Sequence, residues 1–337
     1  MGKYDKYICT ELKKRHMLPG PTPEERDNIA AEGLRLGMEH LLWIDDEVIP
    51  GAYYSESTWI WPNSYPHVLP WAEAMKRSVN DTPMFPHAHE FPELLSWWGS
   101  DPDRPEETSG MGMIMGDEEI PLPKSWVAYI PAGMIHMPTR PPGSKVTSLP
   151  VLHWTSGPGV YTREGDERPD SAAAAKHEQA VVTQRKAGEQ KNSRYIVYGY
   201  KPGIKRPAYM RELDPRYSRP IAYIDRQVIP DAEFGCDTWW LLPGEKSKAG
   251  QQLMDAHTLP HGTSIVFSSL NYDDITDLCA EVELWIGGEK HVINKSFGAY
   301  IPPEVSQGPV TIRNITKQIF FMVSQPVGEG VGKYRGR

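Results

Sequence analysis

The chain has 337 residues, of which 39 % are hydrophobic, and this length and apolar content predict roughly two domains, each with its own core. Its 36 basic and 44 acidic residues give a net charge of -8 without a Lys/Arg run, which excludes the electrostatic pattern of a nucleic-acid-binding protein. Because no stretch approaches the roughly 18 apolar residues of a membrane span, and the first fifteen residues lack the apolar run of a signal peptide, we expect a soluble, cytoplasmic protein without a membrane partner.

One helix is expected near the N-terminus. Thr22 is a candidate N-cap, Pro23 suits the first helical position, and Glu25 is placed to complete a capping box. The following segment, IAAEGLRLGMEHLL, has apolar residues at helical spacing. The sequence therefore predicts an N-terminal extension over residues 1–40 that contains one helix.

The rest of the chain has the pattern of β-structure. Short runs rich in Val, Ile, Tyr, Trp and Thr, such as SWVAYIP and AEVELWIGG, are separated by clusters of Pro, Gly, Asn and Asp. The 32 prolines and 29 glycines favour short segments joined by turns. Several strands in roughly 120 residues predict a sandwich or a small barrel in each half of the chain.

The clearest candidate for a chemical site is the segment PHAHEFPE. Side chains alternate between the two faces of a strand, so His87, His89 and Glu93 are expected on one face. Two imidazoles and one carboxylate form the three-ligand set of non-haem Fe(II) sites, and Mn, Ni, Co and Zn accept similar donors. Pro92 removes a ladder hydrogen bond, so a bulge at this point would change the position of Glu93.

A fourth donor follows in the segment PAGMIH. The Pro-Gly turn would bring His136 into the site from a neighbouring strand. Arg140 is a candidate for binding a substrate carboxylate through its guanidinium fork, and a solvent-exposed arginine in the TRPPG turn is the alternative. Aromatic and methionine side chains near both motifs would either line an apolar pocket or pack the core: Trp97, Trp98, Met113, Met115, Tyr129, Met134 and Met137.

A polar stretch and then a repeat follow. Residues 161–193 are expected to form an exposed linker whose Ala-rich centre is helical. IDRQVIPDA at 224–232 agrees with IDDEVIPGA at 44–52 in six of nine positions, and KSFGAYIP at 295–302 agrees with KSWVAYIP at 124–131 in six of eight. Two blocks in the same order indicate that a whole domain was duplicated, with copies over 41–160 and 194–330.

The second copy does not repeat the ligand pattern. The offset of 171 between the later blocks places Gln307 opposite His136, and His257 and His261 are four residues apart with no suitably spaced Glu. We therefore expect a second copy without metal, serving as a structural or dimerisation module. A site rebuilt from His257 and His261 is the alternative.

The two motifs of the first copy resemble those of the cupin superfamily. HAH with Glu93 matches the core of the first cupin motif and PAG with His136 matches the core of the second, so the duplicated chain resembles a bicupin. Other motif positions depart from the pattern: Asp81 and Ser125 replace glycines, Gly99 comes one residue early and Arg140 replaces an Asn. The resemblance implies an all-β fold of two double-stranded β-helix, jelly-roll-like barrels, with His87, His89, Glu93 and His136 binding one divalent metal in the first.

The resemblance also implies an activity. We expect a metal-dependent oxidoreductase, a dioxygenase that uses Fe(II) to act on an aromatic or enolic small molecule, with Glu93 also able to act as a base. One alternative is a non-redox lyase, isomerase or decarboxylase that uses Mn(II), Ni(II) or Zn(II) on a small oxygenated acid, and another is a non-catalytic binding protein. Because bicupins commonly pair through strand edges and N-terminal segments, we expect a homodimer in which the first 40 residues pack across the partner.

Overall fold

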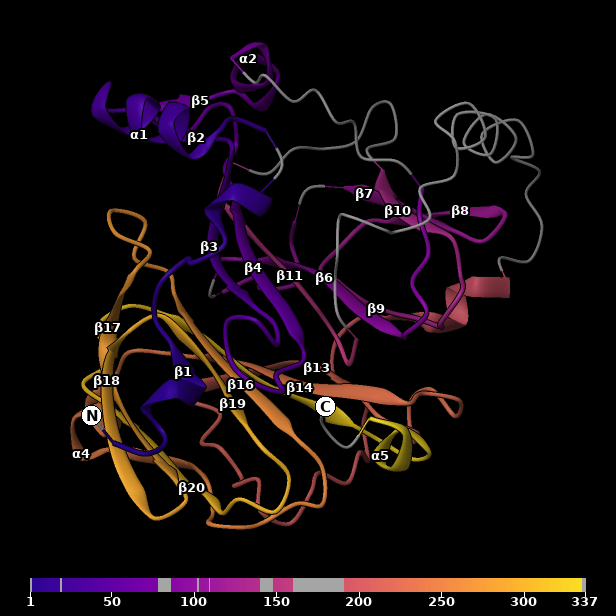
Figure 1. The fold of residues 1–337 in the computed structure, drawn as a ribbon, viewed down its shortest axis with the longest axis vertical. Coiled ribbons are helices and arrows are strands. Elements are labelled where there is room, and N and C mark those ends of the chain that lie inside the picture. Colours follow the sequence, from indigo (N-terminus) through magenta and orange to yellow (C-terminus); the bar gives the residue numbers. More distant parts are fainter. Residues whose placement is uncertain are drawn as a thin grey trace.

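The computed structural model describes residues 2–18, 20–77, 86–101, 103–108, 110–139, 148–159 and 191–334. Arg140 and nearly all of the predicted linker lie outside these ranges. The described chain forms two β-rich units, each built from a six-stranded sheet and a smaller sheet (Figure 1). The prediction of an all-β fold with two jelly-roll-like units is thus confirmed, although in the described residues no sheet closes into a barrel.

The first unit has a six-stranded sheet in the order β12-β9-β6-β11-β4-β3 and a three-stranded sheet in the order β10-β7-β8. Strands β2 and β5 form a separate parallel pair. The strands of this part of the chain are β2 (Arg35–Leu36), β3 (Met38–Ile44), β4 (Tyr54–Ile60), β5 (Val68–Leu69), β6 (Glu93–Gly99), β7 (Met111–Met115), β8 (Glu118–Leu122), β9 (Trp126–Ile130), β10 (His136–Thr139), β11 (Val151–Gly157) and β12 (Ile196–Val197).

The second unit repeats this arrangement, with sheets in the order β1-β19-β16-β21-β14-β13 and β15-β20-β17-β18. Its strands are β1 (Ile8–Cys9), β13 (Ser218–Ile224), β14 (Phe234–Leu241), β15 (Gln251–Met254), β16 (Thr263–Ser269), β17 (Asp277–Ile286), β18 (Glu289–Lys295), β19 (Phe297–Ile301), β20 (Gln307–Arg313) and β21 (Ile319–Pro326). The helices of the described chain are short: η1 (Asp5–Tyr7), η2 (Arg15–Met17), α1 (Pro23–Ala31), α2 (Trp71–Lys76), η3 (Lys191–Tyr195), α4 (Glu245–Ala249) and α5 (Gly330–Lys333).

The predicted duplication is visible in matched turns. After β3, the amides of Val48 and Ile49 donate to the carbonyl of Asp45, and after β13 the amides of Val228 and Ile229 donate to the carbonyl of Asp225. The second repeated block gives β9 in one unit and β19 in the other. The sequence repeat therefore corresponds to a repeat of structure.

The N-terminal helix is shorter than its apolar pattern suggested. Thr22 caps α1 by accepting a hydrogen bond from the amide of Glu25, as expected. The helix ends at Ala31, and Gly33 follows with a φ of +76°, a left-handed conformation that stops a helix. The rest of the predicted helical segment forms β2 and most of β3, because its apolar side chains are buried against the sheet.

Each unit contributes an edge strand to the other. Strand β1, near the N-terminus, pairs with β19 of the second unit, while β12, which precedes the second unit, pairs with β9 of the first. Within the first 40 residues, β1 is paired inside its own chain, and packing of this segment across a partner molecule stays a prediction.

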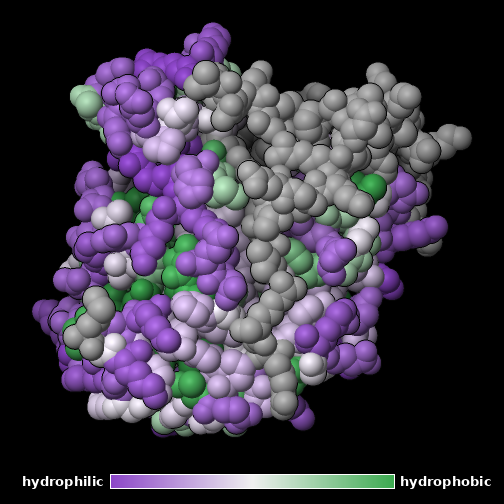
Figure 2. Space-filling model, viewed as in Figure 1, coloured by the Kyte–Doolittle hydropathy of each residue, from purple (hydrophilic) through white to green (hydrophobic). Residues whose placement is uncertain are grey.

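The two six-stranded sheets pack against each other through a shared apolar layer (Figure 1). Trp98 and Trp240, from different units, both contact Phe320, with ring centroids 6.4 and 5.4 Å apart. The face shown in Figure 2 is mainly hydrophilic, with small separate hydrophobic areas. None of the helices in the described chain has the length and apolar character that a bilayer crossing requires.

Candidate metal centre

His87 and His89 lie in a loop that is hydrogen-bonded to the start of β10 and to the turn before it. His87 and His136 form an isolated bridge in which each backbone amide donates to the other residue's carbonyl, at 3.1 and 2.8 Å. The amide of Gly133 donates to the carbonyl of His89 at 2.7 Å. Two segments that are about fifty residues apart in the sequence are therefore held side by side.

The expected continuous strand from His87 to Glu93 is not present. Residues 88–92 are outside any strand, and β6 begins at Glu93, directly after Pro92. Pro92 has no amide hydrogen for a ladder bond, so the strand starts after it. The side chains of His87, His89 and Glu93 nevertheless converge, because the loop runs beside His136 at the start of β10.

The structure brings together all four predicted metal ligands. One nitrogen from each of His87, His89 and His136 lies within 4.8 Å of the others. The Oε2 atom of Glu93 lies 2.7 Å from Nε2 of His136 and 3.6 Å from Nε2 of His89. His89, Glu93 and His136 are at most 6 % exposed, so this donor set is inside the unit.

Neighbouring groups orient these donors. Nδ1 of His136 lies 3.0 Å from the carbonyl of Met134, so Nδ1 carries a hydrogen and Nε2 is the nitrogen that faces Glu93 and the other histidines. Thr155, on β11, donates from Oγ1 to Oε1 of Glu93 at 2.5 Å, which leaves Oε2 directed at the histidines. The ring of Phe91 stacks on His89 with an interplanar angle of 13°. The site is thus pre-organised for a cation.

Glu93 is held as a carboxylate. Burial alone would raise its pKa, but the hydrogen bond and charge of His136, the charge of His89 and the Thr155 hydroxyl together lower the pKa well below the usual range of a glutamate. An ionised carboxylate with imidazole nitrogens is a donor set that suits divalent first-row transition metals. The residues present therefore fit a metal ion of this class.

A second acidic group lies on the same interior face of the sheet. Glu56 of β4 is the cross-strand neighbour of Thr155, and its Oε1 lies 2.7 Å from Nε2 of His40. The hydroxyls of Tyr54 and Thr58 also donate to Glu56, at 2.5 and 3.3 Å. Burial opposes ionisation, but His40, Tyr54 and His153 offset this effect and lower the pKa of Glu56 to about 2.

His153 completes this interior group. It is the second residue before Thr155 along β11, so both side chains face the interior, and it pairs across the sheet with Trp97. Its Nδ1 lies 2.8 Å from the carbonyl of Ser96, and its ring centroid lies 5.1 Å from that of Trp97. Burial lowers the pKa of His153, although the hydrogen bond to Ser96 and the charges of Glu56 and Glu93 act in the opposite direction.

The sequence analysis did not identify Thr155, Glu56 or His40. Each lies on a strand that is far from the HAH motif in the sequence. The pairing of β3, β4, β11 and β6 brings these residues close to the site. Arg140 lies outside the described residues. Of the candidate pocket residues, Trp97 faces the interior beside His153, whereas Trp98 faces the second unit.

The second unit has different residues at the corresponding places. His257 and Gln307 form a bridge that matches the bridge between His87 and His136, as the sequence offset predicted for Gln307. The counterparts of His89 and Glu93 are Leu259 and Thr263, and Nε2 of Gln307 donates to Oγ1 of Thr263 at 3.2 Å. Of the four ligand positions, one histidine is kept.

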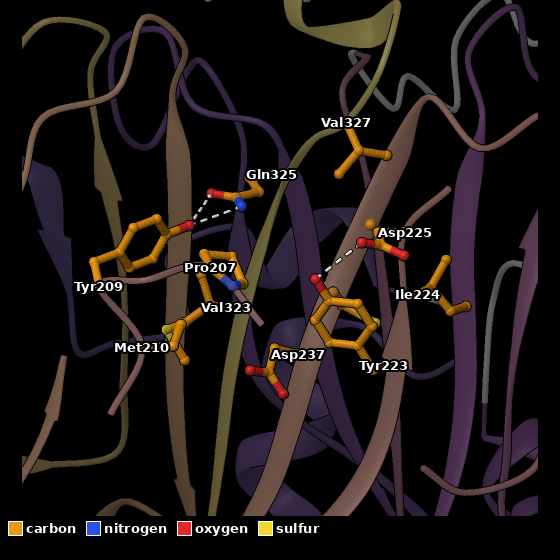
Figure 3. A pocket seen from close by; sticks show the side chains of 12 residues that line it. Pro207, Tyr209, Met210, Tyr223, Ile224, Asp225, Asp237, Val323, Gln325 and Val327 are labelled. Carbon is orange, nitrogen blue, oxygen red and sulfur yellow. Dashed lines mark hydrogen bonds between the residues drawn. The ribbon is translucent and has the colours of Figure 1, made fainter. Parts of the chain in front are cut away.

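The second unit has a pocket whose lining includes Tyr209, the residue that stacks on His257 (Figure 3). Asp237, the counterpart of Glu56, lies in its wall, but Arg206 is 2.7 Å from its Oδ2 atom. Figure 3 shows Tyr209 hydrogen-bonded to Gln325 and Tyr223 to Asp225 among the lining residues. Tyr209 also stacks on His257, with 3.7 Å between the ring centroids, so the retained histidine is packed against an aromatic ring.

Comparisons with known proteins give similarity to solved structures. Neither the protein-family models nor the curated proteins contain a match to this chain. AerE from Microcystis aeruginosa is similar over 82 % of this chain and 88 % of its own, with 10 % identity and a TM-score of 0.41. The oxalate decarboxylase of Lactobacillus farciminis, in a formate complex, is similar over 85 % and 80 %, with 12 % identity and a TM-score of 0.45. The oxalate decarboxylase of Bacillus subtilis, described with Mn(II) centres, is similar over 84 % and 72 %, with 10 % identity and a TM-score of 0.44.

Proposed function

We propose that this chain is a bicupin metalloenzyme whose reaction takes place in the first unit, at a divalent ion bound by His87, His89, Glu93 and His136. The observation that carries the proposal is the convergence of three imidazoles and one ionised carboxylate inside a sandwich. Such an interior is normally apolar, because buried charges destabilise a fold unless they are paired or bind a metal. The second unit, with leucine, threonine and glutamine at matching positions, shows that the fold does not require these donors.

The ion would supply Lewis-acid or redox activation of a bound ligand. The chain's own residues position that chemistry: Met134 fixes the tautomer of His136, and Thr155 fixes the carboxylate of Glu93. Phe91 stacks on His89, and Trp97 lies beside His153, so aromatic side chains adjoin the polar groups of this interior and favour a flat organic molecule as ligand.

For the reaction itself we propose an Fe(II)-dependent dioxygenase acting on an aromatic or enolic small molecule. A non-redox lyase, isomerase or decarboxylase acting on a small oxygenated acid is the second candidate, with Mn(II), Ni(II) or Zn(II) as the ion. The observation that favours the second candidate is the additional interior group formed by Glu56, His40 and His153, because proton transfer is the central step of such reactions. A homodimer is also proposed, from the resemblance alone.

Elemental analysis tests the metal centre. Protein purified without chelator is expected to contain about one transition-metal ion per chain, and the His87→Ala and Glu93→Ala variants are expected to lose most of it. The His261→Ala variant is the matched control, since it removes a buried histidine from the second unit. Equal metal content in wild type and in the first two variants would exclude the site.

Turnover with and without dioxygen separates the two reaction classes. For a substrate found by screening aromatic, enolic and oxygenated acids, a dioxygenase consumes one dioxygen per product and stops under anaerobic conditions. A lyase, isomerase or decarboxylase continues at the same rate without dioxygen. Ligand-dependent thermal stabilisation without any product would indicate a binding protein instead.

A further inference from the structure

His153 is the interior histidine of the first unit that is not part of the metal-ligand set but lies next to it. It lies one same-face step along β11 from Thr155, the residue that contacts Glu93, which corresponds to about 7 Å between Cα atoms. The side chain of His153 remains partly exposed, as does that of Glu56 at 12 %, although both lie on the interior face.

The hydrogen bonds of His153 define which nitrogen is available. Nδ1 faces a backbone carbonyl, that of Ser96, so it must carry a hydrogen. In the neutral ring, Nε2 then has a free lone pair, and no residue of the described chain is hydrogen-bonded to it. Burial lowers the pKa of the ring and favours this neutral form, so Nε2 holds a lone pair before a ligand binds.

A negative charge is available nearby to stabilise the protonated ring. Glu56 accepts hydrogen bonds from Tyr54, Thr58 and His40 and is ionised. His40 contacts Glu56 through Nε2, which lies 2.7 Å from Oε1. The carboxylate of Glu56 lies on the same interior face as His153, where its negative charge favours an imidazolium.

The charge balance of the interior also favours His153 as the acceptor of a proton from a bound ligand. The two carboxylates, Glu93 and Glu56, balance the charge of a divalent ion, because imidazoles that bind the ion are neutral. If a ligand lost its proton to solvent as it bound, the buried site would be left with one uncompensated negative charge, which is unfavourable in a low-dielectric interior. Retaining the proton inside the unit avoids this cost.

Resting on the function proposed above, we propose that His153 is the base that takes the proton from a hydroxyl or enol ligand as that ligand binds at the metal centre. The O–H bond of the ligand breaks, its electron pair stays on the oxygen that binds the ion, and the proton forms a bond to Nε2 of His153. The charged and titratable groups that face the ring are Glu56 of β4, His40 of β3 and Glu93 of β6.

Calorimetric proton counting tests this step without a known substrate. The probe is acetohydroxamate, a small chelator that binds metal through two oxygens after losing its hydroxyl proton. Titrating it into the Zn(II)-loaded full-length protein, in buffers of different ionisation enthalpy, gives the number of protons released. We expect almost none from the wild type, about one per ligand from His153→Gln, with affinity about tenfold lower, and an intermediate number from Glu56→Gln.

The control is His291→Gln, which removes a partly buried histidine from the second unit and should behave as the wild type. Zinc content and circular dichroism establish that each variant is folded and loaded. If His153→Gln does not fold, the proton count of Glu56→Gln decides. A full proton released by the wild type, or a count unchanged in both variants, overturns the inference, as does the absence of acetohydroxamate binding to the loaded wild type. A wild-type protein that retains no metal would instead overturn the proposed function itself.

Discussion

At the scale of single residues, the first unit is unusual because its interior holds two carboxylates among histidines. Each carboxylate is ionised for a stated reason: Glu93 by His136 and His89, and Glu56 by His40 and the hydroxyl of Tyr54. Thr155 touches Glu93 and is the cross-strand neighbour of Glu56. Thr155 is therefore the residue that links Glu56 and its neighbours to the candidate metal centre.

Replacing Thr155 by valine tests this link. The Thr155→Val variant keeps the shape of the side chain but removes the donor to Oε1 of Glu93, so the carboxylate loses its fixed orientation. We expect the affinity for a divalent ion to fall about tenfold, as is typical when a partner of a metal ligand is removed. Competition with a chromophoric chelator measures the affinity, and Thr58→Val, which affects Glu56 only, should leave it unchanged.

The lowered pKa of Glu56 predicts a pH-dependent stability. Its folded pKa of about 2 is below the unfolded value near 4.5, so its ionisation stabilises the fold above pH ~4.5 and this contribution is lost as the pH falls toward 2. Urea unfolding of metal-free protein should show Glu56→Gln less stable by about 2 kcal/mol at pH 6, with the difference disappearing at low pH. A constant difference across this range would contradict the assignment.

Glu39 is the control, because its pKa is shifted in the opposite direction to that of Glu56. Burial raises its pKa, so its contribution is present at low pH and is lost as the pH rises through its folded pKa. Glu39→Gln keeps an acceptor for the hydrogen bond from Trp61, at 2.9 Å in the wild type, and should become more stable relative to the wild type as the pH rises.

At the scale of elements, the sequence motifs identified the four donors but not their support. The four candidate ligands lie in two short segments with recognisable spacing, whereas Thr155 and Glu56 come from strands whose register no local pattern reveals. The apolar pattern predicts a longer helix from Pro23 than the structure has. The segment after Gly33 has apolar residues that suit a buried strand equally well. Local patterns thus predicted the element types better than their ends or pairings.

The matched elements of the two units allow a transfer of the metal site. His257 and Gln307 have the same bridge as His87 and His136, and Leu259 and Thr263 occupy the positions of the other two ligands. The triple variant Leu259→His, Thr263→Glu and Gln307→His is expected to raise the metal content from about one to about two ions per chain. Elemental analysis provides the measurement.

Gln307→His alone should remain near one ion per chain, because two histidines without a carboxylate are a weak donor set. If the folded triple variant bound no additional ion, matched strand positions would not be sufficient, and the stacking of Tyr209 on His257 would be the first contact to examine.

At the scale of the whole molecule, the two units are tied together in two ways. Their six-stranded sheets share an apolar layer, and β1 and β12 each complete the sheet of the other unit. The duplication could be predicted from the repeated segments, but this exchange of edge strands could not, because two-residue strands carry almost no pattern of their own. The exchange makes each half of the chain depend on the other.

Cleavage between the units tests this dependence. A protease site introduced within residues 161–190 and cut in the folded protein should give two fragments that elute together and separate only in denaturant. Size-exclusion chromatography followed by denaturing electrophoresis makes the comparison. Fragments that separate under native conditions, with each retaining its β-sheet signal, would show that the crossed strands add little.

The crossed strands also bear on how such a chain arose. A reciprocal exchange of equivalent strands between two copies of one fold is the geometry of a domain-swapped dimer, here within a single polypeptide. The ancestor with one unit would then have been an obligate pair with two equivalent centres. Fusion would have removed that symmetry and allowed the two halves to diverge, as they do at the four candidate ligand positions.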